Sequence, residues 1–297
     1  MAKPIPSNAV WLITGCSSGL GKHLSQVLSQ SSSYRVVATA RKEASLSYLA
    51  DTPNVLKLAL DVTSQSSIDS AVSATLSKFG RIDVLVNNAG YGLFGDTEAI
   101  TDAQARAQLE TNFWGAVNMT KAVLPIFRST SEGGVVVQIS SMGGYIAVAG
   151  NSFYHASKFA LEGFTESVAS EMFPEWNIRF LILEPGGMKT EYAKGSMVLP
   201  ERHPAYKAKE GPTSILAGYL ESPSIDETWA DPTVVAKVMV GVLEKGNIPL
   251  RLPMGSDAWG MIKNDVDFTA KELEKWKELS ESTSGAAQLA SIDFLKK

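Results

Sequence analysis

The chain has 297 residues, a hydrophobic content of 44%, a formal net charge of -4 and a single cysteine, Cys16. These values supply enough apolar side chains for a sizeable core, leave no basic surface for binding nucleic acid, and exclude an intrachain disulfide. With no signal-peptide core and no run of about 20 apolar residues, we expect a cytoplasmic protein without a membrane span, formed by one domain over residues 1–297.

Short aliphatic runs alternate with helical stretches along the first two thirds of the chain. Runs such as 84–86 and 135–137 are apolar on both faces, which is typical of parallel strands buried between two layers of helices. Right-handed crossovers then give an α/β fold, a single doubly wound Rossmann-type domain with a parallel sheet. The predicted strands are residues 10–14, 35–40, 55–60, 84–87, 135–140 and 178–183. The predicted helices are residues 18–28, 65–79, 102–126 and 152–172, with Thr63 and Ser64 suited to cap the second.

A glycine-rich turn follows the first predicted strand and leads directly into a helix. Glycine lets the backbone bend and approach a pyrophosphate closely, while the helix N-terminus presents unpaired N–H groups and a partial positive charge. A tight strand-to-helix turn that binds no ligand would have the same composition. The candidate phosphate-binding residues are Gly15, Ser17, Ser18, Gly19, Leu20 and Gly21.

The second predicted strand is followed by Arg41 and Lys42, where an NAD-binding site usually has an acidic residue for the ribose. A carboxylate would repel a 2′-phosphate, whereas the Arg41 guanidinium can form charge-assisted hydrogen bonds with it. The alternative is an ordinary pair of solvated cations after a strand. This position therefore favours NADP(H).

Tyr154 and Lys158 are four residues apart on a predicted helix, so their side chains project from the same face. An ammonium group beside a phenol stabilises the phenolate and lowers the pKa of the phenol, which makes Tyr154 a candidate general acid/base. Such a pair also arises often by chance, as a half-buried tyrosine beside a lysine that extends to solvent.

Polar residues follow the fourth and fifth predicted strands, at the carboxyl edge where α/β sheets bind ligands. Asn87 and Asn88 suit either a cofactor-binding turn or a plain turn. Ser140 and Ser141 are chemically equivalent, and the residues alone do not choose between them. Asn112, inside a long apolar helix, is either a functional amide or a hydrogen-bonded core amide.

In their order and spacing, these segments resemble the short-chain dehydrogenase/reductase family. The resemblance implies that Ser141 orients a carbonyl oxygen, Tyr154 protonates it, and Lys158 binds the nicotinamide ribose and lowers the Tyr154 pKa. Asn112 would hold a water that relays protons, Asp61 would contact adenine, and Thr190 would hold the nicotinamide carboxamide. The cofactor-binding residues that it implies are Gly15, Ser17, Ser18, Gly19, Leu20, Gly21, Arg41, Asp61, Val62, Asn88, Ala89, Gly90, Tyr154, Lys158, Pro185, Gly186, Met188 and Thr190.

The last third of the chain changes character twice. Residues 187–229, rich in Gly, Pro and Ser, predict a lid insertion, and residues 255–297 return to helical spacing and predict a C-terminal extension on the domain's edge. The extension resembles reductases grouped with 17β-hydroxysteroid and retinol dehydrogenases. The family often forms homo-oligomers through the helices before and around its active tyrosine, which a long lid and tail can block.

The expected function is that of a metal-free, NADP-dependent oxidoreductase, a carbonyl reductase or alcohol dehydrogenase that acts by hydride transfer. Apolar residues in the segments that face the nicotinamide predict a bulky lipophilic small molecule as substrate, although about half of them are expected to be core or lid packing. These residues are Phe94, Tyr145, Ile146, Val148, Phe153, Met188, Met197 and Trp229. The alternatives are a non-redox cyclase or isomerase that binds the cofactor, and a cofactor-sensing regulator.

Overall fold

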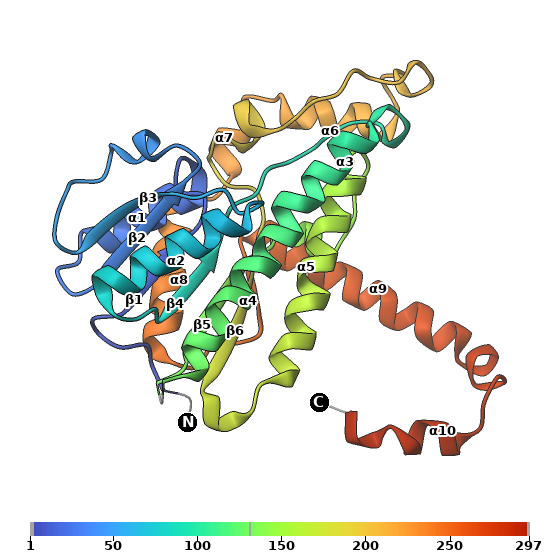
Figure 1. The fold of residues 1–297 in the computed structure, drawn as a ribbon. Coiled ribbons are helices and arrows are strands. Elements are labelled where there is room, and N and C mark those ends of the chain that lie inside the picture. Colours follow the sequence, from blue (N-terminus) through green and yellow to red (C-terminus); the bar gives the residue numbers. More distant parts are fainter. Residues whose placement is uncertain (1–2, 131, 296–297) are drawn as a thin grey trace.

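In the computed structural model, which describes residues 3–130 and 132–295, seven parallel strands form one sheet (Figure 1). The order β3-β2-β1-β4-β5-β6-β7 reverses direction between β1 and β4, as in a doubly wound fold, and confirms the predicted fold class. Residues 1–2, 131 and 296–297 of the expected domain lie outside the described residues. The strands are β1 (Val10–Ile13), β2 (Arg35–Ala40), β3 (Val55–Ala59), β4 (Val84–Asn87), β5 (Gly134–Ile139), β6 (Ile178–Pro185) and β7 (Arg251–Met254).

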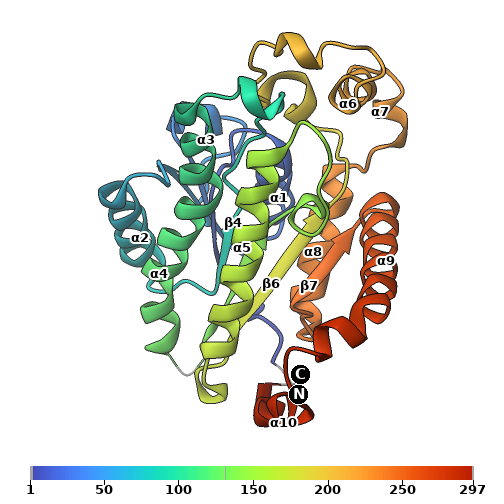
Figure 2. The same cartoon turned by 90° about the vertical axis from the view of Figure 1, so that its right-hand side faces the viewer.

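Helices cover both faces of the sheet (Figure 2). Along β1, Trp11 and Ile13 pack with α1 and α8, whereas Val10 and Leu12 pack with α2, α4 and α5. Alternate side chains of one strand therefore enter two separate cores, which explains why the central strands are apolar at every position. The covering helices are α1 (Gly19–Ser29), α2 (Gln65–Phe79), α4 (Gly115–Arg128), α5 (Ser152–Glu171) and α8 (Pro232–Lys245).

The predicted helix over residues 102–126 is three consecutive segments. An α-helix, α3 (Asp102–Leu109), continues through a π-helical turn (Glu110–Trp114) into α4. The wider turn changes the directions in which the side chains leave the helix, and Asn112, within this turn, is buried. The sequence predicted continuous α-helix because the apolar spacing is similar on both sides of the turn.

Two elements beyond residue 229 were not predicted. Helix α8 begins after Asp231, whose side chain accepts a hydrogen bond from the Thr233 N–H, and ends at Gly246 with φ +77°. Strand β7 pairs only with β6 and contains Pro253, which an edge strand tolerates because one side of its backbone lacks a partner strand. A four-residue strand with an arginine and a proline gives little β-signal in the sequence.

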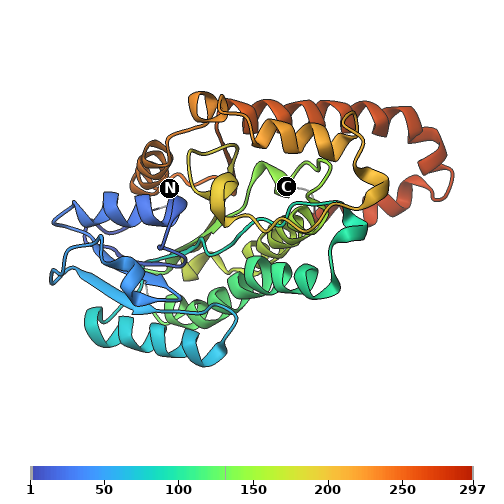
Figure 3. The same cartoon turned by 90° about the horizontal axis from the view of Figure 1, so that it is seen from above.

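The predicted lid, residues 187–229, runs over the carboxyl ends of the strands (Figure 3). It contains α6 (Pro212–Leu220), α7 (Ile225–Thr228) and short helical turns. Two isolated parallel bridges join it to the rest of the chain, Leu93 with Val198 and Met188 with Ala230. We call this stretch the lid segment.

The C-terminal extension is helical, as the spacing predicted, but most of it does not pack on the domain (Figure 1). Helix α9 (Ser256–Glu281) buries Ala258 and Ile262, whereas Leu273 is 69% exposed and Trp276 51% exposed. Packing on the domain's edge is therefore confirmed for the first turns and wrong for the rest, because α9 continues straight past the sheet before α10 (Ala286–Ser291). No helix in the described part of the chain is both long and apolar enough to cross a bilayer.

Candidate active site

The glycine-rich turn between β1 and α1 forms one end of a cleft of about 1030 Å³ at the carboxyl ends of the strands. Gly15 has φ +71° and Gly19 has φ +55°, a backbone region that favours glycine. Ser18 precedes α1 without a side-chain cap, so the start of this helix faces the cleft with its backbone N–H groups. Cys16 in this turn is fully buried, and burial raises the pKa of its thiol to about 12.

The turn after β4 is tied directly to the glycine turn. Thr14 Oγ1 accepts hydrogen bonds from the backbone N–H groups of Asn88 and Ala89, each at 2.9 Å. The Asn88 amide donates to the carbonyl oxygens of Thr14 and Gly15, both at 2.9 Å. A Cβ on Gly15 would lie 2.7 Å from the Ala89 Cα, so the two turns are in direct backbone contact. This network fixes the floor of the cleft.

Gly21 has a structural role that differs from the predicted cofactor contact. It does not belong to the cleft lining, unlike the other residues predicted in this turn. A Cβ at Gly21 would lie 2.4 Å from the Asn88 Nδ2 and 2.6 Å from the Gly15 oxygen. Gly21 therefore lets α1 pack closely against the two turns.

Arg41, Asp61 and Val62 line the same cleft beyond the glycine turn, at the ends of β2 and β3. Hydrogen bonds from the backbone N–H and the hydroxyl of Thr63 hold the pKa of Asp61 below its ordinary value. Arg41 is exposed, and its guanidinium is open to an anionic group in the cleft.

The two serines after β5 point to different places. Ser140 is buried and donates a 2.6 Å hydrogen bond to Glu162 Oε1. Ser141 lines the cleft, its Oγ accepts a hydrogen bond from the Gly143 N–H at 3.0 Å, and its hydroxyl acts to lower the pKa of the Tyr154 phenol. Their geometry supports the assignment of Ser141 that the family resemblance implied.

Tyr154 and Lys158 share one face of α5 and both line the cleft. The Lys158 Nζ lies 5.9 Å from the centre of the Tyr154 ring and donates a 2.7 Å hydrogen bond to the Ile139 oxygen. Burial lowers the pKa of Lys158 to about 8, against the opposing charge of Glu162. Burial also raises the pKa of Tyr154, although hydrogen bonds from Ser141 and Tyr192 act in the opposite direction. This net direction differs from the lowered phenol pKa that the sequence predicted, because desolvation outweighs the stabilisation of the phenolate.

Asn112 lies behind the cleft and does not line it. It is 1% exposed; its Oδ1 accepts from the Tyr91 N–H, and its Nδ2 donates to the Tyr91 oxygen and to Ser157 Oγ. The amide is thus hydrogen-bonded to protein, as in the core-amide alternative. A Cβ on Gly90 would lie 3.1 Å from the Asn112 Oδ1 and 3.8 Å from the Lys158 Nζ, so both side chains lie beside Gly90. Asn112 is therefore near the lysine, but it has no direct access to the cleft.

The remaining predicted cofactor residues meet on the far side of the cleft. Pro185, Gly186, Met188 and Thr190 all line it, as do the turn residues Asn88, Ala89 and Gly90. The Gly187 N–H donates a 2.7 Å hydrogen bond to Asp257 Oδ2 at the start of α9.

Comparison with known proteins agrees with this arrangement. Residues 9–197 match the sequence profile of the short chain dehydrogenase family. The oxidoreductase calM of Penicillium decumbens is 40% identical over 283 residues, 93% of each chain, and retinol dehydrogenase 8 of Bos taurus is 37% identical over 81% of this chain and 79% of its own. A solved short-chain dehydrogenase from Streptomyces avermitilis, 35% identical, superposes with a TM-score of 0.83 over 93% of this chain and 100% of its own.

The protein is a short-chain dehydrogenase/reductase. Membership supports redox activity on a small molecule with a nicotinamide cofactor, and it confirms the family that the sequence motifs indicated. Within the described ranges, this short-chain dehydrogenase has no group of three His, Cys, Asp or Glu side chains placed to hold a metal ion.

The end of the cleft beyond Tyr154 is apolar in this short-chain dehydrogenase. Of the apolar residues predicted to line it, Ile146, Val148, Met188, Met197 and Trp229 do so. The other three do not belong to the lining: Phe94 packs against Gly150, Phe153 packs on the small core that contains Leu93, and Tyr145 ends a helical turn. The lining contains further residues that were not predicted: Met142, Tyr192, Val198, Leu216, Tyr219 and Leu220.

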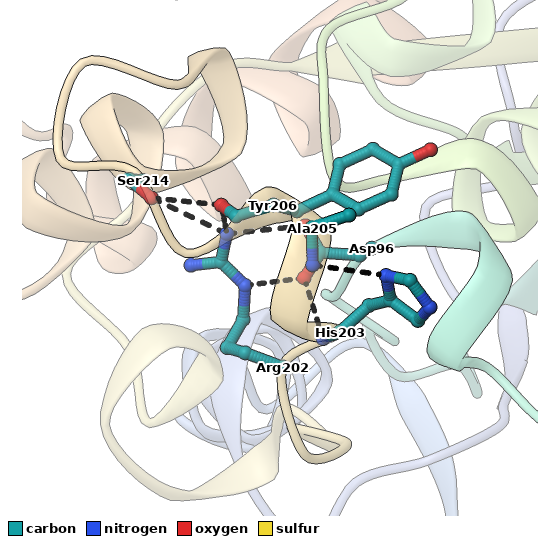
Figure 4. Close-up of polar contacts among 6 residues, drawn as sticks. All are labelled: Asp96, Arg202, His203, Ala205, Tyr206 and Ser214. Carbon is teal, nitrogen blue, oxygen red and sulfur yellow. Dashed lines mark hydrogen bonds and ion pairs between the residues drawn. The ribbon is translucent and has the colours of Figure 1, made fainter.

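A buried ion pair fastens the lid segment to the loop after β4 (Figure 4). The Asp96 side chain is 0% exposed and accepts hydrogen bonds from the Arg202 Nε at 2.5 Å and Nη2 at 3.1 Å. The His203 N–H also donates to Asp96, and Arg202 donates to the Tyr206 oxygen. The bonds to Asp96 join residues 106 and 107 positions apart, a separation at which local sequence patterns carry no signal.

His155, next to the tyrosine, was also missed. Its Nδ1 lies 2.8 Å from the Gly143 oxygen, and its Nε2 accepts from the Val148 N–H at 3.0 Å. Burial lowers the pKa of this imidazole. A neutral His155 therefore fastens the apolar loop that lines the cleft beside Tyr154, and its position directly after the tyrosine was the signal that could have identified it.

Proposed function

We propose that this short-chain dehydrogenase uses NADP(H) to reduce a bulky apolar carbonyl, or to oxidise the corresponding alcohol, with Tyr154 as general acid/base. The observation that carries the proposal is that Ser141, Tyr154 and Lys158 meet at one point of a single cleft, between a glycine turn and an apolar end. Asn112 supports this centre by holding the Tyr91 backbone from behind.

The cleft fits a dinucleotide. Its glycine turn has two left-handed glycines and an uncapped helix start, which suit a pyrophosphate. Asp61 is held as a carboxylate beside this end, while Thr190 and Lys158 line the other. Arg41 provides the positive charge for a 2′-phosphate, and this supports NADP(H) over NAD(H). When bound, the nicotinamide supplies or receives the hydride.

The protein residues supply the proton and hold the substrate oxygen. Ser141 and Tyr154 can both donate to a carbonyl oxygen, which polarises the bond before reduction. The raised pKa of Tyr154 keeps the phenol protonated at neutral pH, as a proton donor must be. In the oxidative direction Tyr154 must lose its proton first, so we expect oxidation to rise with pH into the alkaline range.

An apolar substrate is supported by two observations. The lining beyond Tyr154 includes Ile146, Met197, Leu216 and Trp229, which suits a lipophilic molecule. A relative that covers most of this chain is named for retinol, an apolar alcohol.

A buried, protonated Cys16 is compatible with the proposed cytoplasmic location. For self-association we propose the α4 and α5 faces, where Phe159 is 44% exposed.

The decisive experiment is oxidation of NADPH and NADH by the purified protein with apolar ketones, quinones and small polar carbonyls. We expect turnover that prefers NADPH and bulky apolar ketones and falls about 1,000-fold in Tyr154→Phe, because the phenyl ring keeps the packing and removes the proton donor. Arg41→Ser should weaken NADPH about tenfold and leave NADH unchanged, since one charge-assisted contact is lost.

Other outcomes point elsewhere. NADPH binding without oxidation on any carbonyl would favour a cofactor-sensing regulator. Conversion of a substrate without stoichiometric NADPH consumption would favour a non-redox cyclase or isomerase. Faster turnover of small polar carbonyls would contradict the apolar substrate.

A further inference from the structure

Tyr192 is a lid residue whose hydroxyl reaches the reaction centre. It lines the same cleft as Tyr154, and its hydroxyl acts to lower the pKa of the Tyr154 phenol. The two ring centres are 6.0 Å apart, with an angle of 59° between the rings. Tyr192 lies only two residues beyond Thr190, whose Oγ1 accepts a hydrogen bond from the Tyr192 N–H at 3.3 Å.

The Tyr192 ring is held against the loop after β4 by close packing. A Cβ on Gly92 would lie 2.4 Å from the Tyr192 Oη and 2.7 Å from its Cζ, so a glycine is required for the ring to reach this position. The lid is fastened at the same place: the Val198 N–H donates to the Gly92 oxygen at 2.8 Å, and the Phe94 N–H donates to the Val198 oxygen at 3.0 Å. Tyr192 therefore reaches Tyr154 with the lid segment in its docked position.

Resting on the proposed function, we propose that Tyr192 is a positioning residue for Tyr154. Its hydroxyl donates to the phenolate oxygen that remains when Tyr154 gives its proton to the substrate oxygen. Tyr192 keeps its own proton, and one O–H bond breaks on Tyr154 as another forms on the product alcohol.

The hydroxyl groups around Tyr154 explain why a second tyrosine is needed. Two hydroxyls, those of Ser141 and Tyr192, act to lower the pKa of the Tyr154 phenol. Ser141 must turn toward the carbonyl oxygen during reduction, which leaves Tyr192 as the donor to Tyr154. Burial raises the pKa of Tyr154, and the bond from Tyr192 opposes that rise. Burial, together with the neighbouring Tyr154 phenol, raises the pKa of Tyr192 well above its ordinary value, so Tyr192 stays protonated.

Other titratable groups lie around the two phenols. Lys158 is the cation nearest to the Tyr154 ring in the described contacts, and Glu162 acts on Lys158 by its charge. The titratable side chains on the elements packed round the phenols are Lys158, Glu162 and His155 on α5, Tyr91 after β4, Glu191 on the lid and Asp257 on α9. Substitutions at Tyr192 leave all of these unchanged.

The first test is Tyr192→Phe, which keeps the ring and removes the hydroxyl. We expect kcat to fall about tenfold with KM nearly constant, and the alkaline limb of the oxidation profile to move up by about 1 pH unit, since a hydrogen bond to a charged group is lost. The matched control is Tyr34→Phe, whose hydroxyl donates to Glu244 outside the cleft and whose loss should leave the profile unchanged.

A second variant moves the hydroxyl without removing it. Gly92→Ala places a methyl group where the Tyr192 ring now lies and should give the same pH shift as Tyr192→Phe. The double variant should shift no further than either single variant, because both remove the same hydrogen bond. A rise in KM without a pH shift in Tyr192→Phe would mean that Tyr192 only lines the pocket, and it would overturn the proposal.

A readout without turnover separates this inference from the proposed function. Ultraviolet titration of the phenolate, as the difference between each protein and the same protein carrying Tyr154→Phe, reports the Tyr154 pKa without substrate. Tyr192→Phe should raise that pKa, and an unchanged value would overturn the proposal. If the wild-type protein reduces no carbonyl, the proposed function fails, while this titration still decides the role of Tyr192.

Discussion

The floor of the cleft and the lid segment are held in different ways. The floor consists of turns at adjacent strand ends, joined by short hydrogen bonds from Thr14 and Asn88 to backbone atoms. The lid depends on the Asp96–Arg202 ion pair and two isolated bridges, and Ile215 on α6 is 63% exposed. The floor is thus joined by a dense set of bonds between two neighbouring turns, whereas the wall that selects the substrate is held at a few separate points. Changes on the floor should lower turnover, whereas changes to the side chains that hold the lid in place, which do not include Tyr192, should weaken substrate binding.

The largest effect is expected on the floor, in Lys158→Met. The substitution keeps the length of a buried side chain and removes the ammonium that donates to the Ile139 oxygen beside Tyr154. We expect kcat to fall about 100-fold or more, with the folded structure retained by circular dichroism. Lys121→Met on the exposed side of α4 is the matched control and should match the wild type. Equal losses in both variants would refute a specific role for Lys158.

A smaller effect, of a different kind, is expected for Arg202→Met on the lid. It leaves the Asp96 carboxylate buried without its cation, which costs about 3 kcal/mol unless the lid moves. We expect the lid to loosen, so that KM for the carbonyl rises about tenfold while kcat changes little, and proteases cut residues 187–229 faster. If kcat fell and KM stayed constant, the contrast between floor and lid would be wrong.

The same ion pair predicts how the lid responds to acid. Burial alone would raise the pKa of Asp96, but hydrogen bonds from Arg202 and the His203 N–H outweigh it and hold the pKa below its ordinary value. The ion pair therefore stabilises the docked lid at all pH values above about 4, and this stabilisation is lost as the pH falls through the lowered pKa. Limited proteolysis of the lid across this range checks the prediction, and an Asp96→Asn variant should show no such acid transition.

The smallest effect is expected in the tail. Leu273→Ser on α9 changes a side chain that is 69% exposed, so the free energy of unfolding should change by less than about 0.5 kcal/mol and turnover should stay constant. Ile262→Ser, at a buried position of the same helix, is the contrasting variant and should destabilise the protein measurably. Thermal unfolding of the two variants tests whether α9 joins the domain only through its first turns.

The floor was predictable from sequence, and the lid contacts were not. Gly15, Asn88, Ser141 and Tyr154 each lie at or just beyond a strand end or on a helix face, so local patterns place them together once a parallel sheet is predicted. The Asp96–Arg202 pair is created by the tertiary path of the lid, and neither residue has a local pattern that reveals its partner. The same limit applies to the tail, because helical spacing predicts a helix without showing whether a partner covers it.

The burial of Cys16, the cysteine in the glycine turn, determines how the protein can be labelled. Cys16 is the sole cysteine in the sequence, it is fully buried, and its Sγ donates to the Ile13 oxygen at 3.4 Å. A thiol with a pKa of about 12 carries almost no thiolate at neutral pH, so alkylating reagents and mild oxidants should leave the folded protein intact. A cysteine introduced at an exposed lid position such as Ile215 would then be labelled alone in the wild-type background, and a fluorophore there would report the movement of the lid directly.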